Sequence, residues 1–242
     1  MATLRAVFFD AAGTLFDARE PVGATYARIA RQFGLDASDE AVTAGFRRAF
    51  GHAPELAFGV GHTAGELHER EREWWRGVVA RSFEGLGTFS DFDSFFETLF
   101  AYFAEPSNWR PHPEAPSTLG RLKDCGLRLG VISNFDSRLY EILDNFGLSP
   151  LFDSITISSE AGYAKPRPEV FAVALAKLGA RPDQAMHVGD SRRLDFDGAY
   201  AAGMTAVLLD PGLDGPVCIG DRKALVRSLA YLKEVTQVLG SA

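Results

Sequence analysis

Hydrophobic and polar positions alternate regularly from Leu127 onward. Short apolar runs that end in small or polar residues predict buried strands, and these are "LRLGVIS" (127–133), "FDSITIS" (152–158), "QAMHVGD" (184–190) and "TAVLLD" (205–210). Amphipathic stretches between them predict helices, namely "SRLYEILDNFG" (137–147), "RPEVFAVALAKLG" (167–179) and "RRLDFDGAYAAG" (192–203). This alternation indicates an α/β fold with a Rossmann-like, doubly wound parallel sheet covered by helices on both faces.

The segment 223–239 is predicted as one more helix. Leu225, Leu229, Leu232 and Val235 fall on one face of that segment at helical spacing.

Residues 17–108 follow a different pattern, with helical periodicity and no convincing buried strand. The helical stretches are 23–35, 39–50, 65–83 and 91–104, and the block comes directly after the first apolar run, "AVFF". We therefore predict two domains: a Rossmann-like core formed by 1–16 and 109–242, and an all-helical cap formed by 17–108. An insertion at the end of the first strand would hang over the edge of the sheet where such folds carry their chemistry.

Composition excludes several classes of protein. The formal net charge of −7 gives no overall basic field for nucleic acid or an anionic membrane. Cys125 and Cys218 are too few for a disulfide framework, and we expect both to be reduced and buried. The apolar run near the N-terminus is too short for a signal peptide, and no stretch reaches the length of a membrane span. We expect a soluble, cytoplasmic protein.

Residues suited to chemistry stand where predicted strands end, in four motifs. Each is ordinary when taken alone, since an aspartate often caps a helix and Ser-Asn is a common turn pair. In order along the chain they are Asp10 after "AVFF", Ser133 and Asn134 in "VISNFD", Lys165 in "AKPRPEVF", and Asp190 with Asp195 in "GDSRRLD". Because the carboxyl ends of parallel strands share one edge, these residues are predicted to form a single site.

With these motifs the chain resembles the haloacid dehalogenase-like hydrolase superfamily, in the branch with a helical cap after the first motif. The tracts "REWWRGVV" and "SNFDSRL" are similar to the subgroup named after haloacid dehalogenase-like hydrolase domain-containing protein 3. The resemblance implies a nucleophilic aspartate, Asp10, which takes a phosphoryl group as an aspartyl-phosphate. It also implies Mg²⁺, held by Asp10, the backbone carbonyl of Ala12 and Asp190.

The same resemblance assigns the remaining residues. Ser133 and the backbone N–H of Asn134 would hold phosphate oxygens, and Lys165 would neutralise the charge on the nucleophile and the phosphate. Asp195 would orient Lys165 or metal-bound water. Thr14, in the tight turn after the nucleophile, counts among the catalytic residues.

Ala12 departs from the phosphatase pattern, which has a second aspartate at this position. Alanine keeps the backbone carbonyl but removes the side chain that protonates the leaving group, a contribution of about 10²–10⁴-fold. The sequence therefore predicts a weakened or specialised phosphatase acting on a small phosphorylated metabolite. His62 or Glu66, in the tract "AFGVGHTAGE" (57–66), is a candidate for supplying the missing proton.

Three other functions remain to be weighed. Phosphonatases of the superfamily use a cap lysine, but Lys123 is the first lysine in the chain, and arginine cannot form the imine they need. The 2-haloacid dehalogenases work without metal and lack the Gly-Asp pair found here at Gly189 and Asp190, so we rank dehalogenation behind phosphoryl transfer. A relative without turnover, acting as a binding or regulatory module, is the third alternative.

Overall fold

The computed structural model describes residues 3–215, 217–218, 220 and 222–240. Within these residues the chain forms two compact units. The first takes the described parts of Met1–Asp17, Ala57–Val60 and Pro111–Ala242, and the second takes Ala18–Leu56 and Gly61–Arg110. The sequence assigns 57–60 to the helical insert, whereas in the structure this segment belongs to the first unit, where the N–H of Phe58 donates to the carbonyl of Ser159 at 3.2 Å.

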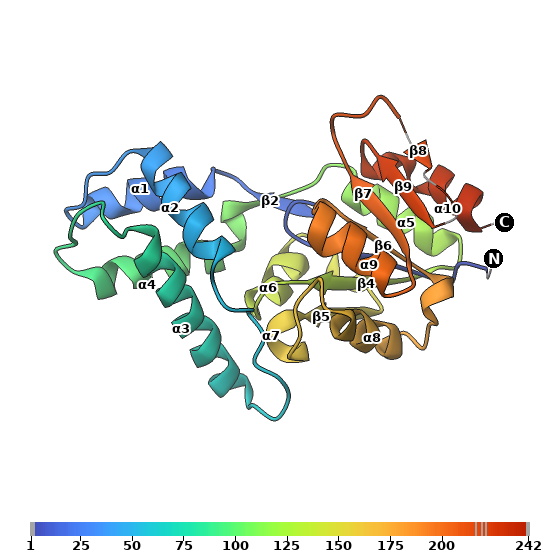
Figure 1. The fold of residues 1–242 in the computed structure, drawn as a ribbon, viewed down its shortest axis with the longest axis horizontal. Helices are drawn as coiled ribbons and strands as arrows, with labels where there is room; N and C mark the ends of the chain where they lie inside the picture. The colour runs from blue at the N-terminus through green and yellow to red at the C-terminus, as the bar shows by residue number, and fades with distance from the viewer. Residues whose placement is uncertain (1–2, 216, 219, 221, 241–242) are drawn as a thin grey trace. The chain divides into compact units, whose positions relative to one another are not determined.

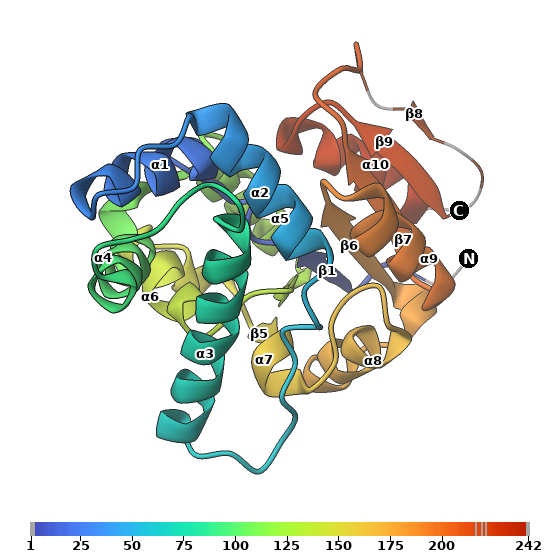
Figure 2. The ribbon, with the colours of Figure 1, turned by 60° about the vertical axis from the view of Figure 1, so that its left-hand side comes forward.

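The first unit contains a twisted sheet in the order β5-β4-β1-β6-β7-β9-β8. Its strands are β1 (Ala6–Phe9), β4 (Arg128–Ser133), β5 (Ser154–Ile157), β6 (Ala185–Gly189), β7 (Thr205–Leu209), β8 (Val217–Cys218) and β9 (Lys223–Val226). All pairings from β5 to β9 are parallel, and β8 runs antiparallel to β9. Figure 2 shows β1, β6, β7 and β9 in this order. Strand β1 lies inside the sheet, between β4 and β6, and ends just before Asp10.

Helices cover both faces of this sheet. They are α5 (Ala115–Asp124), α6 (Arg138–Asn145), α7 (Ser158–Ala161), α8 (Pro168–Lys177), α9 (Gly198–Ala201) and α10 (Leu232–Gly240), with a π-helix at Arg192–Asp197. Every residue of β1, β6 and β7 is buried. Since consecutive strand residues point to opposite faces, burial of all of them requires cover on both sides. The α/β, Rossmann-like class predicted from the alternating pattern is confirmed.

The prediction for segment 223–239 is wrong in its first half. Lys223–Val226 is strand β9, paired in parallel with β7, and α10 begins only at Leu232. Ala224 and Val226 are fully buried while Lys223 and Leu225 are half-buried, which is the period-two pattern of a strand. The leucines at 225, 229 and 232 fit a helical spacing by coincidence. Residues 223–226 form a strand because they pair with the edge of β7.

The second unit is helical. Its helices are α1 (Val22–Gln32), α2 (Asp39–Gly51), α3 (Ala64–Ser82) and α4 (Phe92–Ala104), seen in Figure 1. Two glycines let neighbouring helices approach closely: a Cβ at Gly23 would lie 1.9 Å from Thr43 Oγ1, and one at Gly45 would lie 2.0 Å from the Ser82 carbonyl oxygen. Rings of Tyr26 and Phe83 stack at 6.3 Å in its core.

Two short strands, unpredicted from the sequence, lie where the chain passes between the units. They are β2 (Phe16–Ala18) and β3 (Trp109–Pro111), which pair with each other. Short 3₁₀ turns complete the described elements at Pro106–Asn108, Ser149–Leu151, Pro182–Gln184 and Leu229–Tyr231.

Two expectations about solvent and membrane exposure can be compared with the structure. Cys125 is predicted to be buried, but it is an exposed free cysteine. Its position three residues after the buried Leu122 would continue the apolar face of α5, but the helix ends at Asp124. The side chain of Cys218 lies outside the described residues. Among the described residues, no helix combines the length and the apolarity that crossing a bilayer requires.

Candidate active site

Asp10 lies at the carboxyl end of β1, directly after the last strand residue, Phe9. Its N–H donates to the Val188 carbonyl at 2.9 Å, so the ladder between β1 and β6 continues to this residue. The chain then turns sharply, and Gly13 adopts φ +89°, which favours glycine. A Cβ at Gly13 would lie 2.6 Å from Asp190 Oδ2. The glycine therefore allows the turn to pass directly against a second carboxylate.

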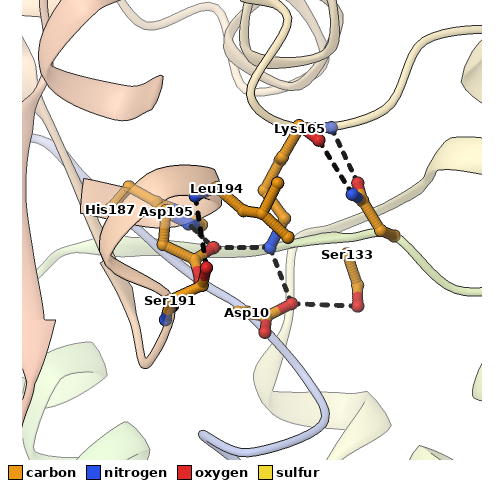
Figure 3. A network of polar contacts seen from close by, with 8 residues as sticks. Asp10, Ser133, Lys165, His187, Ser191, Leu194 and Asp195 are labelled. Atoms are coloured by element: carbon orange, nitrogen blue, oxygen red, sulfur yellow. Dashed lines mark hydrogen bonds and ion pairs between the residues drawn. The ribbon is translucent and has the colours of Figure 1, made fainter. Parts of the chain in front are cut away.

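Two side chains bind the same oxygen of Asp10. Ser133 Oγ donates to Asp10 Oδ1 at 3.0 Å, and Lys165 Nζ donates to it at 2.7 Å (Figure 3). Burial raises the pKa of the Asp10 carboxyl, although the positive charge of Lys165 opposes that rise. Neither Ser133 nor Lys165 donates a hydrogen bond to the second carboxylate oxygen, Oδ2.

Lys165 joins two carboxylates, because its Nζ also donates to Asp195 Oδ1 at 2.6 Å. The residue is only 4% exposed. Burial on its own would lower the pKa of Lys165, but the charges of Asp10 and Asp195 outweigh it and the pKa lies above its usual value. The ammonium is therefore charged and bridges the first and fourth motifs.

Asp195 is held by the π-helix, where the sequence predicts an ordinary helix. Asp195 and Phe196 both donate their N–H to the Ser191 carbonyl, at 3.0 and 3.1 Å, which widens the turn. Asp195 Oδ2 accepts the N–H of Ser191 at 3.0 Å. Burial would raise the pKa of Asp195, but Lys165 and a hydrogen bond from His187 hold it well below its usual range.

His187 is the residue that sequence reasoning missed. It is fully buried on β6, and its Nε2 lies 2.8 Å from Asp195 Oδ1. Burial lowers the pKa of His187, so the ring is neutral and Nε2 carries the proton it donates. The available signal was position: His187 precedes Gly189 by two residues in "HVGD", so both lie on one face of the strand, which is the face Asp195 packs against.

Asn134 uses its side chain on the backbone of Lys165. Its amide nitrogen donates to the Lys165 carbonyl at 2.9 Å, and its amide oxygen accepts the Lys165 N–H at 2.7 Å. The sequence predicts only its own backbone N–H as a phosphate ligand.

Thr14 and Ala12 share the turn after Asp10. Thr14 is fully buried, and its Oγ1 has no hydrogen-bond partner among the described residues. Ala12 is half-buried and forms a bridge with Phe16. The structure thus brings Asp10, Ser133, Lys165 and Asp195 into direct contact, while the Thr14 hydroxyl is not bonded to any of them.

Three carboxylates gather at this point, and their chemistry fits a hard cation. Ligand oxygens of Asp10, Asp190 and Asp195 lie within 4.8 Å of one another. Lys165 is the cation that contacts two of them, which leaves the group negatively charged. Burial, followed by the charges of Asp10 and Asp195, raises the pKa of Asp190 to about 6. Oxygen donors with an uncompensated negative charge are what Mg²⁺ prefers.

Glu66, a candidate for the missing proton donor, has a local partner. Its Oε2 accepts hydrogen bonds from the N–H and the Oγ1 of Thr63 at 2.8 and 2.9 Å, which forms a capping box at the start of α3. Both hydrogen bonds lower the pKa of Glu66, and the bond from the Thr63 N–H has the larger effect. The structure therefore favours a helix-capping role for Glu66.

The fold and the site define a class: an α/β protein in which an interior strand of the parallel sheet ends at a buried aspartate, paired with a lysine beside a carboxylate cluster. Residues 4–203 match the model of the haloacid dehalogenase-like hydrolase family, and the chain belongs to this family.

Two relatives are similar to this chain over most of its length. Haloacid dehalogenase-like hydrolase domain-containing protein 3 from Homo sapiens is 35% identical over 241 residues, covering 95% of this chain and 92% of that protein. A glyceraldehyde 3-phosphate phosphatase from Methanothermobacter thermautotrophicus is 31% identical over 211 residues, covering 87% of each. The resemblance to the subgroup named after the first of these, inferred from "REWWRGVV" and "SNFDSRL", is confirmed.

Solved structures agree on the fold. A predicted phosphoglycolate phosphatase from Haemophilus somnus is 26% identical with a TM-score of 0.66, covering 98% of this chain and 100% of that one. L-2-haloacid dehalogenase from Xanthobacter autotrophicus is 22% identical with a TM-score of 0.70, covering 99% and 100%. The second likeness concerns the fold alone.

Proposed function

We propose that this hydrolase is a Mg²⁺-dependent phosphatase that acts on a small phosphorylated metabolite through Asp10. The observation that carries the proposal is the geometry around Asp10. Ser133 and Lys165 fix Oδ1, at 3.0 and 2.7 Å, which leaves Oδ2 to attack phosphorus. The relationship to a glyceraldehyde 3-phosphate phosphatase supports phosphoryl chemistry over other hydrolyses.

In the proposed reaction, Asp10 Oδ2 forms a bond to phosphorus while the bond from phosphorus to the leaving oxygen breaks. The aspartyl-phosphate is then hydrolysed by water, which returns the carboxylate and releases phosphate. Lys165 balances the negative charge that gathers on Asp10 and the phosphoryl oxygens. Ser133 and the backbone N–H of Asn134 orient the phosphoryl group, and Asp195 holds Lys165 through the 2.6 Å contact.

Asp10, Asp190 and the backbone carbonyl of Ala12 would hold Mg²⁺. When bound, the ion supplies positive charge that lets the phosphate approach a carboxylate. Ala12 provides no proton for the leaving group. Substrates whose leaving group departs as a stable anion are therefore expected to react best.

The test is phosphate release from para-nitrophenyl phosphate in Mg²⁺, comparing the native protein with Asp10→Asn. The matched control is Asp124→Asn, the same substitution at the exposed last residue of α5. We expect turnover that disappears with Asp10→Asn and with chelator, and that persists with Asp124→Asn. Equal turnover in the native protein and Asp10→Asn would overturn the proposal.

Dehalogenation is the second candidate, favoured by one observation, the absence of an acid at Ala12. Displacement of halide from carbon needs no proton on the leaving group, and Asp10 would again be the nucleophile. Halide release from 2-chloropropionate in the presence of chelator, without phosphatase activity, would favour it. Folded protein that binds Mg²⁺ but performs neither reaction would indicate a binding or regulatory role.

A further inference from the structure

The side chain of Asn134 makes a paired contact that its predicted role does not explain. It joins the end of β4 to the loop before α8, across 31 positions of sequence. The amide meets both main-chain groups of one residue, Lys165, as a neighbouring strand would. Because the Lys165 N–H can only donate and its carbonyl can only accept, these two partners also fix which end of the amide is oxygen.

This contact connects Lys165, whose side chain donates to Asp10, with the residue directly after Ser133, the other donor. Ser133 donates to Asp10 Oδ1, and the next residue, Asn134, holds the backbone of Lys165, which donates to the same oxygen. Two consecutive residues at the end of β4 therefore set both side-chain donors to Asp10 Oδ1.

A lysine in this role needs its backbone held. Its charged group ends a flexible stem with four rotatable bonds, and immobilising it costs entropy. Here Nζ must reach Asp10 Oδ1 at 2.7 Å and Asp195 Oδ1 at 2.6 Å together, from a Cα on a loop rather than on a strand. A displacement of the loop by about 1 Å would break at least one of these bonds.

We propose that the Asn134 side chain is a positioning residue, which fixes the main chain of Lys165 so that its ammonium bridges Asp10 and Asp195. Its own backbone N–H is a separate group and keeps the phosphate-binding role proposed above. The structural part of this inference is independent of the reaction, and only its kinetic test rests on the proposed function.

The first test needs no turnover. The Lys165 ammonium is buried and bonded to two carboxylates. We therefore expect its protons to exchange slowly enough to be observed by ¹H–¹⁵N correlation NMR, with Lys165→Met to assign the signal. We expect Asn134→Leu, which keeps the branching of the side chain but removes both hydrogen bonds, to shift or broaden this signal. The control Asn145→Leu changes an exposed asparagine at the end of α6 and leaves the signal in place. An unchanged signal in folded Asn134→Leu would refute the proposal.

The second test is a double-mutant cycle on para-nitrophenyl phosphate turnover. Loss of two backbone-directed hydrogen bonds should lower kcat/KM roughly 10- to 100-fold in the native background. In the Lys165→Met background the same substitution should change the residual rate less than about twofold, since no ammonium remains to be placed. Asn134→Leu should lower the thermal stability in both backgrounds, because its lost hydrogen bonds are to the main chain of residue 165, which Lys165→Met leaves unchanged. Equal kinetic losses in both backgrounds would contradict positioning through Lys165.

Should neither protein turn over substrate, the proposed function fails while the NMR result still decides the role of Asn134. A lost Lys165 signal in Asn134→Leu, together with an inactive native protein, would establish positioning without phosphatase activity. An unchanged signal with active native protein would refute positioning and leave the phosphatase standing.

Discussion

At the scale of single residues, the two oxygens of Asp10 differ in their surroundings. Oδ1 takes two hydrogen bonds, one of them from a charged lysine, and this stabilises the ionised form in a buried site. The position two residues later is alanine, so the turn after the proposed nucleophile offers no acidic side chain there. A single substitution at Ala12 can therefore test the contribution of a general acid separately from that of the nucleophile.

Ala12→Asp should restore proton donation to the leaving group. We expect kcat for an alkyl phosphate to rise, by up to about 10²-fold. The rise for para-nitrophenyl phosphate should be much smaller, because its leaving group needs no proton. The measurement is the ratio of the two rates in the variant and in the native protein. An equal rise for both substrates, or a fall only for the alkyl phosphate, would show that the new carboxylate does not act as an acid.

Thr14→Val tests a hydroxyl that is buried without a partner. Removing an unpaired polar group of this kind leaves the free energy of unfolding unchanged or raises it by about 1–3 kcal/mol. If the hydroxyl contacts substrate, as its predicted role requires, kcat/KM should fall roughly 10-fold. Chemical denaturation and steady-state kinetics on the same preparation give both numbers. A drop in stability would show that Thr14 Oγ1 is bonded, and unchanged kinetics would remove Thr14 from the catalytic residues.

Motifs located the residues but not all of their contacts. Asp10, Ser133, Lys165 and Asp195 meet because strand ends in a parallel sheet share an edge, which the alternating pattern already implies. The contacts of His187 and of the Asn134 side chain were not predicted, for a physical reason. A buried histidine inside an apolar strand reads as core, and a side-chain bond across 31 residues leaves no trace in local spacing.

At the scale of elements, the π-helix after β6 decides where Asp195 points. One extra residue in its first turn brings the carboxylate back over Gly189, where a Cβ would lie 2.2 Å from Asp195 Cγ. Sequence periodicity cannot distinguish a π-turn from an α-turn over six residues, so this detail was not predictable. The short strands β2 and β3 were missed for a related reason, since three residues give too little pattern to identify a strand. Strand β9 was missed because its leucine also fits a helical spacing with the leucines that follow.

Gly189→Ala should displace Asp195 and break its contact with Lys165. We expect a loss of about 1–3 kcal/mol in the free energy of unfolding, because the methyl group has no room, together with loss of turnover. The control is Gly120→Ala within α5, where a Cβ meets nothing within 4 Å. That change should stabilise the protein by about 0.5–1 kcal/mol through helix propensity. Equal effects of the two substitutions would mean that Asp195 moves aside without cost.

At the scale of the whole molecule, the site concentrates negative charge in a protein that already carries a net charge of −7. Burial first, and then the charges of Asp10 and Asp195, raise the pKa of Asp190 to about 6. For an acid whose pKa is higher in the folded than in the unfolded protein, stability is fully present below the unfolded value. It is then lost as the pH rises through the folded value. Without a divalent cation, ionised Asp190 therefore opposes folding near neutral pH.

Asp190→Asn removes this opposition and also removes a proposed metal ligand, so its effect should reverse with the medium. In chelator the variant should match the native protein below about pH 4, where Asp190 is protonated in both states. Above pH 6 it should melt at a higher temperature than the native protein. In millimolar Mg²⁺ at pH 7 the native protein should gain stability by mass action, and the variant should gain little. The difference in melting temperature between the two should therefore shrink or change sign.

Thermal melts from about pH 3 to pH 8, in chelator and in Mg²⁺, measure both effects. Asp124→Asn is the exposed control and should follow the native protein throughout. A variant less stable than the native protein in chelator at pH 7 would show that ionised Asp190 is favourably placed, so the carboxylate cluster would carry no electrostatic strain. Equal gains from Mg²⁺ in the variant and the native protein would place the ion elsewhere. The two results together separate the charge of Asp190 from its function as a ligand, which activity measurements alone would combine.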